Sequence, residues 1–229
     1  MEPFFTAYNA RFASMPAAAG DKAGSPQWYS WESGPVHMIQ LNTYASYAVG
    51  SDQYKWLVAD LASIDRAKTP WVLVQLHAPW YNSNTVHTND GQPMRVALES
   101  LIVQAKVAQV YAGHVHAYER SVPSINLQPA AGGPVYVTVG DGGNREGLAS
   151  KWVEPCPAWS VYRQATYGFG VLEASNATHL RWVWHQNEDL SPGLVDEVFF
   201  VKGEQVPGAG ECTTAAPRMA DGSAPRFAQ

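Results

Sequence analysis

Apolar residues between positions 37 and 112 alternate between short continuous runs and segments of helical spacing. The runs at 37–41, 71–76 and 108–112 predict three strands. The run at 71–76 is almost wholly apolar, which is typical of a strand buried on both faces. This β-α-β-α-β order predicts parallel strands joined by right-handed crossovers.

Two segments between these strands have the spacing of amphipathic helices. Ser51 is a suitable N-cap for the first, and Leu57, Leu61 and Ile64 follow at i, i+4 and i+7. Pro93 suits the first turn of the second. The apolar positions of the second helix are Met94, Ala97, Leu98, Leu101 and Ala105.

The pattern changes after residue 122. Strands are predicted at 135–139, 168–173, 179–185 and 195–201, without helical spacing between them, so this section is expected to be mainly antiparallel. The first 35 residues show no period and are expected to be loops. Residues 203–229, rich in Ala, Pro, Gly and Thr, are expected to form a flexible tail. The chain thus divides into 1–122, 123–202 and 203–229.

Composition narrows the class of protein. The 229 residues are 46% hydrophobic with nine tryptophans, which indicates a packed core. A net charge of -5 without a basic run argues against nucleic acid as a partner. No apolar run is long enough to span a membrane, and the first residues lack the basic region of a signal peptide. Cys156 and Cys212 permit at most one internal disulfide, and Asn176 begins a glycosylation sequon.

Histidines follow two of the predicted parallel strands. His77 and His114 each stand just beyond a strand's carboxyl end, where open α/β sheets bind ligands, and His116 follows two residues later. Imidazole suits Zn, Fe or Mn, so the pattern favours a metal site over histidines that merely form hydrogen bonds. His87, in the polar loop after His77, either supports this site, faces a substrate or is simply exposed. We interpret His37, His179 and His185 as structural.

Two other kinds of site are disfavoured. The run at 140–147 is rich in glycine and follows a strand, but it lacks the Gly-Lys-Ser/Thr ending of a P-loop, so a tight turn is the preferred interpretation. The chain also has no Gly-x-Ser-x-Gly elbow, which argues against an α/β-hydrolase.

Several motifs together resemble the purple acid phosphatases. Val74-Gln-Leu-His77 matches their V-x-x-H element and Gly113-His-Val-His116 their G-H-x-H element. The stretches that extend these matches are His77-Ala-Pro-Trp-Tyr-Asn-Ser83, His116-Ala-Tyr-Glu-Arg120, Val137-Thr-Val-Gly-Asp-Gly-Gly-Asn144 and Tyr167-Gly-Phe-Gly170. The resemblance covers roughly residues 3–202.

The resemblance implies an α/β (α+β) fold that is part of a calcineurin-like metallophosphoesterase sandwich. It implies hydrolysis of phosphate monoesters by a hydroxide that two metals activate. His77 and His114 would then hold Zn, Mn or Fe(II), and His116 would hold Fe(III). His87 would hydrogen-bond the phosphate or protonate the leaving group, whereas Val86 stands where plant members often have another histidine.

The chain also departs from the family. The D-x-G, G-D-x-x-Y and G-N-H-[DE] elements, which precede V-x-x-H in the family, do not occur upstream of His77. We therefore expect a truncated site that lacks the bridging carboxylate and the iron-binding tyrosine, holds at most a single Zn and has impaired activity. The alternative is a non-catalytic fragment that binds one metal or a partner. A homo-oligomer, a missing N-terminal half, and a secreted or vacuolar location stay open.

Overall fold

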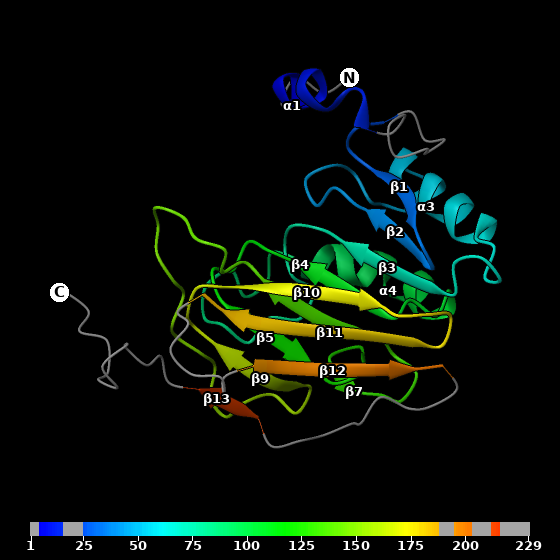
Figure 1. Cartoon of the computed structure of the whole chain (residues 1–229). Coiled ribbons are helices and arrows are strands. Elements are labelled where there is room, and N and C mark those ends of the chain that lie inside the picture. Colours follow the sequence, from blue (N-terminus) through cyan, green and yellow to red (C-terminus); the bar gives the residue numbers. More distant parts are fainter. Residues whose placement is uncertain (1–4, 16–24, 188–194, 203–211, 216–229) are drawn as a thin grey trace.

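The computed structural model describes residues 5–15, 25–187, 195–202 and 212–215 (Figure 1). In chain order its main elements are α1 (Thr6–Phe12), β1 (Tyr29–Ser33), β2 (Val36–Gln40), α3 (Asp52–Ser63), β3 (Trp71–Gln75), α4 (Gln92–Gln104), β4 (Gln109–Ala112), β5 (Tyr118–Ser121), β6 (Ser124–Ile125), β7 (Gln128–Pro129), β8 (Val135–Val139), β9 (Ser160–Gln164), β10 (Gly168–Ala174), β11 (His179–Gln186), β12 (Val195–Val201) and β13 (Thr213–Ala215).

An eight-stranded sheet forms the centre of the fold, with the order β1-β2-β3-β4-β8-β5-β9-β13. Strands β2, β3, β4 and β8 are parallel, whereas β1 pairs with β2, and β5 pairs with both β8 and β9, in antiparallel fashion. The separate sheet β10-β11-β12 is antiparallel throughout. The predicted α/β fold, a parallel β-α-β-α-β segment followed by mainly antiparallel strands, is confirmed.

Two hydrophobic cores lie on opposite faces of the large sheet. Leu57 of α3 and Leu98 of α4 pack with Val72 and Val74 on one face. The other face is covered by β10-β11-β12, where Trp182 and Trp184 contact the strands of the large sheet. Figure 1 shows the helices and the small sheet on either side of the central strands. Strands β3 and β4 are therefore covered on both faces, which explains their continuous apolar sequence.

Two regions without apolar periodicity contain regular structure. Within the first 35 residues, expected to be loops, Thr6–Phe12 form α1 and Tyr29–Ser33 form β1, so that expectation is wrong for these two segments. Thr213–Ala215, in the segment expected to be a tail, form β13, which pairs in parallel with β9. Cys156 and Cys212 form the disulfide that the sequence permits, directly before β13. The rest of 203–229 lies outside the described residues.

A buried ion pair links the two sheets. Asp196 of β12 accepts hydrogen bonds from Arg120 Nε and Nη2 at 2.6 and 2.7 Å, and from the Tyr118 hydroxyl at 2.6 Å. Trp182 Nε1 donates in turn to the Tyr118 hydroxyl. The hydrogen bonds satisfy these polar groups, which keeps the cost of burying the two charges low.

No helix among the described residues is long and apolar enough to cross a membrane.

Asp141 is a second buried carboxylate, just after β8. The side chain has no exposed surface, its Oδ2 accepts a hydrogen bond from Trp184 Nε1, and its Oδ1 has no partner among the described residues. Burial raises the pKa of Asp141 from 3.8 to about 6. The folded chain therefore binds this proton more tightly than the unfolded chain does.

This difference predicts a pH-dependent loss of stability. The favourable contribution of Asp141 is complete below pH 4 and is lost as the pH rises through 6, with a total of about 3 kcal/mol. Asp141→Asn replaces the carboxyl group by an amide that does not titrate, so the variant does not lose this contribution as the pH rises. We therefore expect the difference between the urea midpoints, variant minus parent chain, to increase between pH 4 and 7. A difference that stays constant over this range would contradict the assignment.

Candidate functional site

His77 and His114 meet at one edge of the large sheet. His77 lies two residues beyond β3 and His114 two residues beyond β4, and these strands are adjacent and parallel. The chains stay in register past the strand ends, because Gly113 N donates to the His77 carbonyl at 3.0 Å. The side chains converge so that His77 Nε2 lies 3.0 Å from His114 Nδ1. The carboxyl-end rule thus placed both residues correctly relative to each other.

The backbone of the turn that carries His114 is tightly folded. His114 has a φ of 63°, in the left-handed region that residues other than glycine seldom adopt. Gly140 packs against this turn, and a Cβ there would collide with the Val115 carbonyl oxygen. A strained residue held by close backbone packing is typical of a functional turn, since such strain persists only where surrounding structure enforces it.

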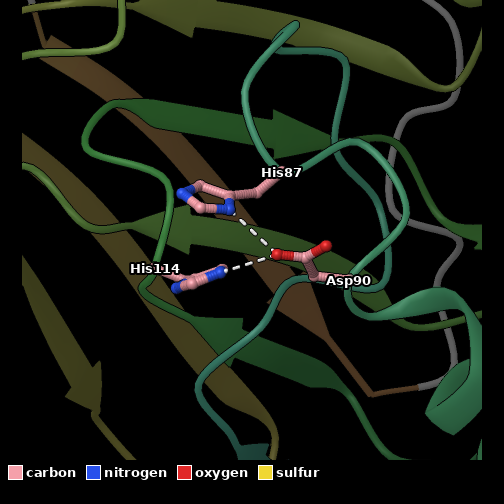
Figure 2. Close-up of side chains that lie close together, drawn as sticks. All are labelled: His87, Asp90 and His114. Carbon is pink, nitrogen blue, oxygen red and sulfur yellow. Dashed lines mark hydrogen bonds and ion pairs between the residues drawn. The ribbon is translucent and has the colours of Figure 1, made fainter.

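His87 reaches the same place from the loop between β3 and α4. Its ring centroid lies 3.9 Å from that of His114, and its Nδ1 lies 2.9 Å from Asp90 Oδ2. The same oxygen of Asp90 lies 3.0 Å from His114 Nε2 (Figure 2). His87, like His114, has a left-handed φ, of 57°. One carboxylate oxygen therefore joins two of the histidines that the sequence singled out.

The charges in this cluster determine which of its groups donate hydrogen bonds and which accept them. Hydrogen bonds from His114 first and His87 second lower the pKa of Asp90, so the carboxylate is ionised and can only accept. With Asp90 as the acceptor, His114 Nε2 is the donor of this hydrogen bond, and His114 Nδ1 faces His77. Partial burial lowers the pKa of His77, and the neighbouring histidines lower it further. Neutral imidazole is the form that binds a metal.

His116 lies outside the group formed by His87, Asp90 and His114, although it is close enough to His77 to help lower the pKa of that residue. His116 Nδ1 lies 3.1 Å from the carbonyl oxygen of Gly147, and its Nε2 lies 3.8 Å from Glu146 Oε2. Both contacts come from the glycine-rich run 140–147. The group His87, Asp90 and His114, whose ligand atoms lie within 4.8 Å of one another, does not include His116. The structure thus brings together three of the four candidate residues and directs the fourth towards a different loop.

A buried carboxylate fastens the loop that carries His87. Glu119 of β5 accepts from the Ser83 backbone N at 2.9 Å and from the Ser83 hydroxyl, and Ser160 Oγ donates to it at 2.6 Å. Gly91, at the start of α4, packs so closely on the Pro79 carbonyl oxygen that a Cβ would not fit. The loop between β3 and α4 is therefore held at its middle, through Ser83, and at its end, through Gly91, and these two points flank His87 and Asp90.

Tyr44 is a further aromatic neighbour of His77. Their ring centroids are 5.6 Å apart, and the Tyr44 side chain is 61% exposed. A cavity of about 380 Å³ lies at the carboxyl ends of β2, β3, β4 and β8 and is lined by Gln40, Gln75, Leu76, His77, Tyr111, Ala112, Gly113 and Val139. Sequence reasoning did not include Tyr44 or Asp90 among the candidates. The signal for Asp90 is its position three residues after His87 and next to a helix start.

The His77–His114 pair fits one divalent cation. A tetrahedral zinc with bonds of about 2.0–2.1 Å holds two nitrogen ligands roughly 3.3 Å apart, close to the observed 3.0 Å. Metal-bound histidine usually donates its other ring N–H to a carboxylate, which is the relation of His114 to Asp90. The described residues do not fit a neighbouring ferric ion, because they place no cluster of three ligands around His116.

Comparisons with known proteins agree on one family. Residues 133–196 match the model described as "Iron/zinc purple acid phosphatase-like protein C". The chain is 46% identical over 195 residues to purple acid phosphatase 18 of Arabidopsis thaliana. The aligned stretch covers 85% of this chain and 44% of that protein. It is 42% identical over 207 residues to phosphoenolpyruvate phosphatase of Allium cepa, covering 86% and 43% respectively.

A solved structure gives the same result. The purple acid phosphatase PPD1 from yellow lupin seeds superimposes with a TM-score of 0.67 and 29% sequence identity, covering 76% of this chain and 32% of that one. One further relative, 38% identical over 212 residues, is named Fe(3+)-Zn(2+) purple acid phosphatase 12 of Arabidopsis thaliana. The chain spans less than half the length of the curated relatives it matches.

Proposed function

Because the chain belongs to the purple acid phosphatase family, we propose that its histidine cluster binds a divalent cation and, through it, phosphate monoesters. The observation that carries this proposal is the convergence of His77 Nε2 and His114 Nδ1, backed by the ionised Asp90. Both histidines belong to motifs of this chain that resemble the V-x-x-H and G-H-x-H elements of the family. A hydrolytic role follows for the site as a whole.

Each residue of the cluster has a separate task. Asp90 keeps the proton of His114 on Nε2, so the Nδ1 lone pair is available for a ligand. When bound, the cation supplies positive charge that polarises the phosphoryl group and offsets the charge of the phosphate oxygens. His87 is held through Nδ1 by Asp90. In the imidazolium form, which carries a proton on both ring nitrogens, its Nε2 would donate a hydrogen bond to a phosphate oxygen or a proton to the departing oxygen.

We propose that the described residues bind one cation and not two. His116 faces the loop 140–147, and no described cluster supplies the further ligands that a ferric ion needs beside it. An Fe(III)–divalent pair of the kind in the family would require ligands besides these. With one cation we expect phosphate binding and slow turnover of the isolated chain, since a two-metal site clamps both the attacking and the leaving oxygen.

Calorimetry and a turnover assay test the proposal. Zinc is titrated into the metal-free chain, phosphate is titrated into the zinc-loaded chain, and hydrolysis of p-nitrophenyl phosphate and of phosphoenolpyruvate is followed. The latter substrate is suggested by the name of the Allium cepa relative. We expect one zinc per chain and zinc-dependent phosphate binding. Zinc binding without any phosphate binding would instead support a non-catalytic, metal-binding role.

The same titration tests the part played by Asp90. Asp90→Asn keeps the size of the side chain but removes the charge that fixes the His114 proton. Loss of such an outer partner typically lowers metal affinity about 10- to 100-fold, and we expect a decrease in that range. Asp65→Asn, at an exposed carboxylate in the loop before β3, serves as the matched control. Equal zinc affinity in both variants would remove Asp90 from the site.

A further inference from the structure

An exposed aromatic ring borders the proposed cation site. Of the described aromatic side chains, Tyr44 has the largest exposed fraction, 61%, although Phe169 and Phe199 are also half exposed. Its ring lies against the His77 ring at an interplanar angle of 43°. The other described residues of the cluster are imidazoles and a carboxylate, and Tyr44 adds an exposed aromatic ring beside His77.

The loop that carries Tyr44 is fixed rather than free. Thr43 Oγ1 accepts hydrogen bonds from the backbone N of His77 at 3.1 Å and of Ala78 at 3.2 Å. The fully buried Gln53 accepts from Asn42 N at 2.7 Å and donates to Asn42 O at 3.0 Å. These bonds join the loop to the segment after β3 on one side and to α3 on the other.

The backbone of Tyr44 is itself anchored, because its N donates to Asn42 Oδ1 at 2.8 Å. An aromatic side chain has only two rotatable bonds, so holding its backbone leaves little freedom to lose on contact with a ligand. A rigid, exposed ring thus offers contact area at low entropic cost. The ring is placed for the organic part of a ligand whose anionic part rests against the histidines.

We propose that Tyr44 selects phosphate monoesters with a planar or aromatic organic group by packing its ring against that group. This inference rests on the proposed function and adds to it the class of ester. Aromatic pairs gain stabilisation beyond the area they bury, which corresponds to a preference of about 2- to 10-fold over an alkyl ester of the same charge. The phenolic hydroxyl has no part in this role.

Calorimetry on the zinc-loaded chain tests the proposal with three probes: inorganic phosphate, methyl phosphate and phenyl phosphate. We expect phenyl phosphate to bind about 2- to 10-fold more tightly than methyl phosphate. Tyr44→Phe should keep this ratio and Tyr44→Ala should bring it close to one. Phe169→Ala, which removes a half-exposed ring that stacks on His185, is the matched control and should keep the ratio.

The outcomes separate the two proposals. Phosphate binding without a phenyl preference, or a preference that survives Tyr44→Ala, overturns the role of Tyr44 alone. Loss of the preference in Tyr44→Phe overturns ring packing in favour of a contact through the hydroxyl. Failure of all three probes to bind the zinc-loaded chain overturns the proposed function and this inference together. Circular dichroism of each variant shows that the fold is retained.

Discussion

Replacing His114 with alanine is expected to lower the affinity of the chain for zinc more than about 100-fold. Loss of a partner that only orients a ligand costs about 10- to 100-fold, and His114→Ala removes both the ligand nitrogen and its link to Asp90. His77→Ala should have a similar effect, since the 3.0 Å separation places its Nε2 opposite His114 Nδ1.

Two further variants make this result specific. A competing arrangement would place the cation among His87, Asp90 and His114, whose ligand atoms also lie within 4.8 Å of one another. His87→Ala distinguishes the two, because it should alter zinc affinity only slightly if the cation lies between His77 and His114. His179→Ala removes a histidine at the first position of β11 and serves as a control. Competition with a chromophoric chelator measures the zinc affinity of each of the four variants. If His114→Ala binds zinc as tightly as the parent chain, both arrangements of the cation are ruled out.

Replacing Asp196 with alanine is expected to destabilise the fold by about 3–5 kcal/mol. The substitution leaves the buried guanidinium of Arg120 without its counter-charge and the Tyr118 hydroxyl without its acceptor. The two sheets would lose their polar link as well. Replacing both charged residues by apolar ones, as in Arg120→Met with Asp196→Leu, should recover most of the loss, because no uncompensated charge then stays buried.

The neighbouring residue of β12 provides the control. Glu197 also pairs with an arginine, Arg181, but on the opposite, exposed face of the small sheet. Glu197→Ala should have little effect on stability, since solvent screens such pairs and water replaces the lost contact. Urea unfolding at pH 7 gives both free energies. If the two single variants are equally stable, the buried pair makes no special contribution.

The parallel part of the fold could be predicted because its residues meet simple rules. Apolar strands, a serine cap and a proline at a helix start fixed β2 to β4 and the helices between them. Strand β5 could not be identified in this way. Its Glu119 and Arg120 are charged, and they are buried only because Ser83, Ser160 and Asp196 reach them from distant segments. Such tertiary pairing leaves no period in the local sequence.

In the candidate site, too, some contacts could be predicted from the sequence and others could not. His77 and His114 follow adjacent parallel strands, so their meeting could be inferred from chain order alone. The contact of Asp90 with both His87 and His114 depends on the path of an irregular loop, which Gly91 and Glu119 determine through packing. His116 follows His114 by only two residues along the chain, yet its Nδ1 contacts the carbonyl oxygen of Gly147.

The far edge of the large sheet has a consequence for how the chain folds during synthesis. Strand β13 pairs with β9 about fifty residues earlier, and the adjoining disulfide closes a span of 56 residues. Until the later segment leaves the ribosome, β9 presents an unpaired edge that can join another chain. The exposure of this edge during synthesis is therefore set by the order in which the segments emerge, and not by the stability of the finished fold.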